Sequence, residues 1–174
     1  MHIKRLTQLD DAVCTQLADI LVDCVEGGAS VSFMLPLSPA RAQAFWQGLR
    51  ASIEAGERVL LVAQDEQGQL LGTVQLVLAQ PENQPHRADI AKLLVHRRGR
   101  RLGAGRALME AAEREAAEAG KSVLVLDTAS GSDAERLYQR LGWQAAGQIP
   151  AYALWPAGGL CATTVFYKFV GGFQ

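Results

Sequence analysis

The sequence contains few cysteines, no long apolar run and no marked excess of either charge, and each absence excludes a class of protein. The three cysteines, Cys14, Cys24 and Cys161, are odd in number and widely spaced among apolar neighbours. This pattern predicts reduced core thiols instead of a disulfide framework or a cysteine metal site. No apolar run is long enough to span a bilayer, and the N-terminal residues do not resemble a signal peptide. We therefore expect a cytoplasmic protein that does not bind membranes.

The charges are balanced, because 17 lysines and arginines face 18 acidic residues and leave a formal net charge of −1. A chain without an overall positive field lacks the non-specific attraction that nucleic-acid binding requires. The three histidines, His2, His86 and His96, do not have the spacing of metal ligands, so we expect no metal site. A length of 174 residues fits one domain with a sizeable core, spanning residues 1–174.

One local stretch, residues 93–106, is strongly basic and combines an apolar strand pattern, a glycine-bearing turn and the start of a long helix. Gly103 and Gly105 leave room for an anion to approach the backbone N–H groups at the start of that helix. The positive end of the helix dipole points to the same place. Three arginines surround the turn, namely Arg100, Arg101 and Arg106. The stretch predicts a pyrophosphate site, and the alternative is a solvated basic turn.

Hydrophobic periodicity predicts an α/β protein with one mixed sheet and helices on both of its faces. Strands are expected at residues 6–9, 58–64, 70–79, 87–95, 123–126, 144–154 and 162–170. Helices are expected from Asp10 or Asp11 to Gly27, from Ser38 to Gly56, and over residues 104–119. A last helix starts at Ser132, which forms a capping box with Glu135.

Two motifs resemble those of the GCN5-related N-acetyltransferase (GNAT) superfamily. Residues 100–105, with the sequence Arg-Arg-Leu-Gly-Ala-Gly, resemble its pyrophosphate motif, and Val95 precedes Arg100 by the family's spacing of five. Residues 134–143, from Ala134 to Trp143 around Tyr138, resemble its second signature. Segments 27–31, 126–128 and 163–168 look like the branch of tabtoxin-resistance acetyltransferases. The resemblance implies a sheet of about seven strands in which one strand pair splays apart.

The resemblance also implies that acetyl-CoA lies between the strands at 87–95 and 123–126, without a metal. Backbone groups of Leu93 and Val95 would pair with its pantetheine arm, and the amides of residues 102–106 would hold its pyrophosphate. The residues expected to bind it are Leu93, Leu94, Val95, Arg100, Arg101, Leu102, Gly103, Ala104, Gly105, Arg106, Ser132 and Tyr138.

Three side chains are candidates for proton transfer. Tyr138 is the expected general acid for the departing thiolate, since a phenol pKa of about 10 is close to a thiol pKa of about 8.5; the alternative is a core tyrosine. Asp89 and Asp127 are the candidates for the general base and for attracting the amine, and each is alternatively a strand-end carboxylate. Asp89 takes the place where many members of the family have a glutamate.

The acceptor pocket is expected beside a Gly-Gly pair, where Ser30, Val31, Phe33 and Met34 either wall the pocket or form a covering loop. The resemblance implies an N-acetyltransferase that moves an acetyl group from acetyl-CoA to the primary amine of a small molecule. The amine would attack directly in a ternary complex, and the acceptor would be an amino acid-like toxin, an antibiotic or a metabolite. The alternatives are a CoA-binding sensor without turnover and a protein N-acetyltransferase. The protein is expected to be a monomer or a homodimer.

Overall fold

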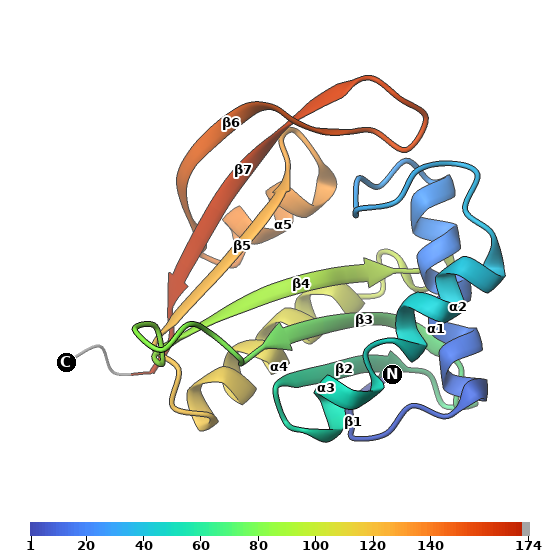
Figure 1. The fold of residues 1–174 in the computed structure, drawn as a ribbon, viewed down its shortest axis with the longest axis horizontal. Coiled ribbons are helices and arrows are strands. Elements are labelled where there is room, and N and C mark those ends of the chain that lie inside the picture. Colours follow the sequence, from blue (N-terminus) through green and yellow to red (C-terminus); the bar gives the residue numbers. More distant parts are fainter. Residues whose placement is uncertain (172–174) are drawn as a thin grey trace.

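A single mixed sheet organises the chain in this computed structural model, which describes residues 1–171. Its seven strands follow the order β1-β2-β3-β4-β5-β7-β6 (Figure 1). The strands are β1 (His2–Leu6), β2 (Arg58–Gln64), β3 (Leu70–Val77), β4 (Arg87–Val95), β5 (Val123–Ala129), β6 (Gln144–Leu154) and β7 (Leu160–Phe169). Neighbouring strands run antiparallel except β4 and β5, which are parallel. The expected mixed α/β fold is confirmed.

Helices cover both faces of the sheet, as expected. They are α1 (Asp11–Glu26), α2 (Pro39–Gln47), α3 (Arg50–Glu54), α4 (Ala104–Glu118) and α5 (Asp133–Arg140), with a 3₁₀ turn, η1, at Arg97–Gly99. Alternate residues of β2 separate the two cores, because side chains alternate between the faces of a strand. Leu60 and Val62 join the core under α1 and α2, whereas Leu61 and Ala63 join the core under α4.

Most expected bounds agree with the structure to within two residues, but three expected elements differ by more. The first strand is β1 at His2–Leu6, whereas Leu9 packs into the core just before Asp10 caps α1. The helix expected from Ser38 to Gly56 is two helices, since the chain tightens at Gly48 and the N–H of Leu49 bonds to the carbonyl of Trp46, three residues back. The strand expected at 123–126 extends to Ala129, because β7 pairs with β5 along its whole length.

The strands β4 and β5 pair over three residue pairs, which end at Asp89 and Val125, and then separate. Figure 1 shows the two strands meeting at one end and diverging towards the other. A bulge accompanies the divergence: Thr73 pairs with Leu94 and Gln75 with Ala91, so Val74 of β3 faces two residues of β4. Such an extra residue bends its strand and increases its twist. The splayed strand pair that the family resemblance implies is therefore confirmed.

None of the helices within residues 1–171 is both long and apolar enough to cross a membrane.

Candidate functional site

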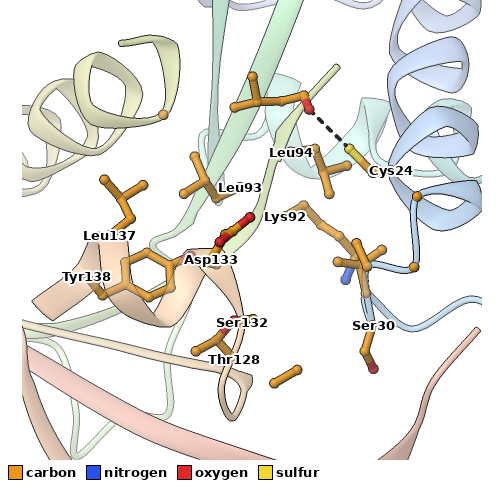
Figure 2. Close-up of a pocket in the computed structure, with 18 of the residues that line it drawn as sticks. Cys24, Ser30, Lys92, Leu93, Leu94, Thr128, Ser132, Asp133, Leu137 and Tyr138 are labelled. Carbon is orange, nitrogen blue, oxygen red and sulfur yellow. Dashed lines mark hydrogen bonds between the residues drawn. The ribbon is translucent and has the colours of Figure 1, made fainter. Parts of the chain in front are cut away.

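A cavity of about 1270 Å³ opens where β4 and β5 separate. Its walls come from β4, β5, α5, the start of α4, the loop after α1 and the β6–β7 hairpin (Figure 2). Most residues expected at the site line this one cavity, and they are Ser30, Val31, Phe33, Met34, Leu93, Leu94, Val95, Arg100, Arg101, Gly103, Ala104, Gly105, Arg106, Asp127, Ser132 and Tyr138. Two expected residues, Asp89 and Leu102, are not part of the lining.

The glycine turn lies at the start of α4, where the backbone can face an anion. Gly103 has φ 82° and occupies the N-cap position, a left-handed conformation that glycine adopts without strain. The N–H groups of the first helical turn have no acceptor within the helix and remain available to a ligand. A Cβ on Gly105 would lie 3.2 Å from Cδ2 of Leu137 on α5, so this position needs a small residue. Leu102 is 62% exposed and is not part of the cavity lining.

Two arginines just before this turn, Arg97 and Arg98, are held by carboxylates of α1. Asp23 is 6% exposed, and its carboxylate accepts a hydrogen bond of 2.9 Å from the backbone N–H of Arg97 and a further bond from the Arg97 side chain. Burial would raise the pKa of Asp23, but the bonds from Arg97 and the nearby His96 hold the pKa below its usual value. Arg98 donates to Asp19 at 3.1 Å one turn earlier on α1. The basic turn is thus an anchored part of the fold.

Sequence reasoning missed Asp23 and Asp19, although their spacing of four on one helix was a signal that both face the same partner. Arg100 also contacts this region, since its Nε donates to the carbonyl of Val95 at 3.3 Å. The same carbonyl accepts a weak bond of 3.6 Å from the thiol of Cys24. Cys24 is buried, as expected for a core thiol, and it also lines the cavity.

Tyr138 belongs to the core and also lines the cavity, so its position fits both alternatives that the sequence left open. Its ring belongs to the core, with its centroid 6.0 Å from those of both Trp143 and Phe166. The residue also lines the cavity, and among residues 1–171 its hydroxyl has no hydrogen-bond partner. Burial raises the pKa of Tyr138 far above its usual value, and the charge of Asp127 raises it further. The phenol is therefore a weaker acid than its unperturbed value suggests.

The two candidate bases lie in different environments. Asp127 follows the point of separation on β5, lines the cavity and accepts a bond of 3.0 Å from the hydroxyl of Thr163. Asp89 lies where β4 and β5 are still paired. It forms an ion pair with Arg87 and accepts a bond of 3.0 Å from the Gln80 side chain. The structure thus brings Asp127, but not Asp89, to the cavity that Tyr138 lines.

The loop after α1 forms the opposite wall and is tied to the β6–β7 hairpin. Ser30 donates from its hydroxyl to the carbonyl of Leu154 at 3.0 Å, and the N–H of Leu35 donates to the carbonyl of Pro156 at 2.9 Å. Phe33 packs edge-on against Phe45 of α2, with ring centroids 5.3 Å apart. On the other side, Ser132 caps α5 by accepting a bond of 3.1 Å from the N–H of Glu135, as expected. The return bond of a capping box is not formed, because the Glu135 carboxylate accepts from the N–H of Gly131 and not from that of Ser132.

Lys92 is a lining residue that sequence reasoning did not single out. It lies in the bulge of β4 with φ 50°, and its ammonium donates to the hydroxyl of Ser32 at 3.2 Å. An apolar strand gave no signal of its role, because the bulge that turns it depends on the pairing with β3. Among the described residues, no group of three or more His, Cys, Asp or Glu side chains is arranged to hold a metal ion.

Comparisons with known proteins agree with this geometry. The family model described as "Acetyltransferase (GNAT) family" matches residues 17–143. The chain is similar to the solved structure of a ribosomal-protein-alanine N-acetyltransferase from Brucella melitensis, with 22% identity, a TM-score of 0.78, and coverage of 98% of this chain and 100% of that one.

Two further solved structures are similar over nearly the whole chain. A GCN5-related N-acetyltransferase from Kribbella flavida is 21% identical with a TM-score of 0.78, over 97% of this chain and 98% of that one. A GNAT superfamily phosphinothricin acetyltransferase from Sinorhizobium meliloti, solved in complex with AcCoA, is 18% identical with a TM-score of 0.78, over 98% of this chain and 90% of that one.

Proposed function

Because the chain belongs to the GNAT family of acetyltransferases, we propose that it transfers the acetyl group of acetyl-CoA to the primary amine of a small molecule. One observation carries the proposal. A single cavity joins the glycine turn at the start of α4, the gap between β4 and β5, and the side chains of Tyr138 and Asp127. This arrangement supplies an anion site, an unpaired strand edge and two groups for proton transfer in one continuous space.

The residues present fit acetyl-CoA. The first-turn amides of α4, with Arg100, Arg101 and Arg106 in the same lining, suit a diphosphate. Beyond Asp89, β4 is no longer paired with β5, so its edge can bond to an extended pantetheine arm as a neighbouring strand would. The bound thioester supplies an activated acetyl group. In the related phosphinothricin acetyltransferase from Sinorhizobium meliloti, AcCoA is present in the solved structure.

Asp127 acts on the amine in this proposal. Its carboxylate attracts the ammonium form and removes a proton directly or through water, which leaves a nitrogen lone pair for attack. We assign the base to Asp127 in preference to Asp89, because Asp127 lines the cavity whereas Asp89 is engaged by Arg87 and Gln80 outside it.

Tyr138 acts on the leaving group. As the nitrogen–carbon bond forms and the carbon–sulfur bond breaks, the sulfur takes the electron pair and the Tyr138 hydroxyl donates a hydrogen bond and a proton to it. The burial that raises the pKa of the phenol also disfavours a free thiolate in the same surroundings, which keeps the two groups comparable as acids. Since Tyr138 is 5% exposed, it stays protonated and ready to donate.

A small acceptor is favoured over a protein. The loop after α1 is bonded to the β6–β7 hairpin through Ser30–Leu154 and Leu35–Pro156, and these contacts narrow the acceptor side. The alternative of a protein N-terminus as acceptor is kept because one related structure is a ribosomal-protein-alanine N-acetyltransferase. A sensor without turnover is disfavoured because Tyr138 and Asp127 share the cavity.

We also propose that residues 1–174 form one domain and that the protein belongs to the tabtoxin-resistance branch of the family. We further propose a reducing cytoplasmic location, because the three cysteines are free thiols.

The experiment is an assay of the full chain with acetyl-CoA and a panel of small amines and N-terminal peptides, read as release of free thiol. We expect turnover with small amines and much weaker turnover with peptides. Varying both substrates should give intersecting initial-rate lines, because the amine attacks in a ternary complex. Binding of acetyl-CoA without thiol release on any amine would identify a sensor, and parallel lines would contradict direct attack.

A further inference from the structure

The ammonium of Lys92 lies on the acceptor side of the cavity. In Figure 2 its side chain extends from β4 across the cavity towards the loop that carries Ser30. The ammonium donates to the Ser32 hydroxyl at 3.2 Å and lies 5.9 Å from the centroid of the Phe45 ring. Both partners are neutral, so neither balances its charge.

Charges of both signs act on Lys92, and the attraction from Asp127 is stronger than the repulsion from Arg58. Among residues 1–171, no carboxylate lies within ion-pair distance of its ammonium. Arg58 is close enough to repel it, whereas Asp127, the one carboxylate that attracts it, is already bonded to Thr163. Burial lowers the pKa of Lys92, which shows that its charge is poorly solvated. A half-buried cation without a carboxylate in contact is incompletely stabilised, and a ligand anion would offset that cost.

Two buried N–H groups nearby are also unsatisfied. Gln75 pairs in register with Ala91, one residue before Lys92, and its Oε1 accepts from Arg58. The Nε2 of Gln75 and the Nε of Arg58 are buried without a hydrogen-bond partner in the part of the chain described. Neither Gln75 nor Arg58 lines the cavity, so of these three donors Lys92 is the one placed to meet a ligand in it.

We infer that Lys92 selects amine acceptors that also carry a carboxylate, and that it binds this carboxylate while Asp127 receives the amine. The inference rests on the proposed function and narrows its substrate class. Lys92 and Asp127 line the same cavity with opposite charges, which complements the two ends of an amino carboxylate. The diphosphate of acetyl-CoA is not the anion concerned, because the turn at residues 100–106 provides its own amides and arginines.

The test uses matched pairs of acceptors, each an L-amino acid and its carboxamide, with the wild-type chain and three variants. Wild type should prefer the acid by roughly 10- to 100-fold in kcat/KM, the worth of one charge-assisted hydrogen bond. The amide's amine is less basic and more of it is neutral near pH 7, so a preference for the acid runs against that bias. In Lys92→Met the preference should fall below about threefold, mainly through a higher KM for the acid.

Lys92→Arg keeps the charge and should keep the preference for the acid. Lys4→Met makes the same change on exposed β1 and is the matched control, with an unchanged ratio expected. Circular dichroism and acetyl-CoA affinity are measured to check that Lys92→Met is folded. If Lys92→Met is not folded, the test is whether Lys92→Arg keeps the preference for the acid.

The outcomes separate the two proposals. Turnover of acids and amides at equal rates in wild type, or an acid preference that survives in Lys92→Met, overturns the role of Lys92 and leaves the acetyltransferase function intact. Absence of turnover on every amine overturns the proposed function and this inference with it.

Discussion

The carboxylate of Asp23 fixes the basic segment that leads into the glycine turn at the start of α4. Replacing Asp23 should therefore weaken both the stability of the fold and the binding of acetyl-CoA. In Asp23→Asn an oxygen can still accept from the Arg97 N–H, but the acceptor is no longer charged. A charge-assisted bond is worth about 1.5–3 kcal/mol and a neutral one about 0.5–1.5 kcal/mol, so roughly 1–2 kcal/mol is lost there. The Arg97 side chain is 64% exposed, and solvent limits its contribution to under about 1 kcal/mol.

The expected total is about 1–3 kcal/mol, which for a chain of this size lowers Tm by roughly 2–12 °C. The pH dependence has a definite sign. Because the pKa of Asp23 is lowered in the folded protein, its stabilisation is present above the unfolded carboxyl's pKa of about 3.9 and is lost as the pH falls through the folded value. The stability gap between wild type and Asp23→Asn should therefore be full at pH 7 and shrink on acidification.

Urea denaturation at several pH values measures this gap, and calorimetric titration with acetyl-CoA measures the effect on the turn. Asp19→Asn is the matched control, since Asp19 is 57% exposed and also pairs with an arginine of the turn. It should cost no more than about 1 kcal/mol. Equal losses for the two variants, or a gap at Asp23 that does not change with pH, would show that burial of this carboxylate is not what anchors the turn.

Three further substitutions test the site. Tyr138→Phe should lower kcat by about 100-fold or more while acetyl-CoA affinity stays within about twofold, and an unchanged kcat would remove its role as acid. Gly105→Val should weaken acetyl-CoA binding by about tenfold or more in titration calorimetry, because even a Cβ at this position would lie 3.2 Å from Leu137. Retained affinity would show that α5 can shift to make room for the valine. Asp127→Asn should lower kcat/KM by about 100-fold at neutral pH, and the defect should narrow at higher pH as the amine loses its proton unaided. A defect that does not depend on pH would argue against a base.

Local signals predicted the parts of the site that are contiguous in sequence. The glycine turn and the start of α4 follow from residues 100–106 alone, because a helix start and its anion site involve adjacent residues. The capping of α5 by Ser132 is equally local. Tyr138 was placed by its motif, but its burial depends on Trp143 and Phe166, and only the folded core shows how strongly its pKa is raised.

The features that sequence reasoning missed depend on contacts between distant segments. Asp89 and Asp127 are similar strand carboxylates, and the register of β4 against β5 decides that one lies before the separation and the other beyond it. The bulge at Lys92 arises from pairing with β3, so an apolar strand pattern does not reveal it. Trp46 and Ile53 both reach the core and are seven residues apart, so periodicity alone predicts one helix across α2 and α3. The break comes from the tight turn after Trp46, where the N–H of Leu49 bonds back to the Trp46 carbonyl.

Because β4 and β5 separate, each of them has an unpaired edge inside the molecule, in addition to the two outer edges of the sheet at β1 and β6. Exposed strand edges are templates for unwanted association with other chains, and natural proteins blunt them with bulges and inward-pointing charges. The β4 edge carries both devices, since Lys92 provides the charge and stands in the bulge itself. Lys92, which we assign to substrate choice, is therefore expected also to disfavour the pairing of foreign peptide strands with the β4 edge, and a neutral replacement should make the protein more prone to aggregate when acetyl-CoA is withheld.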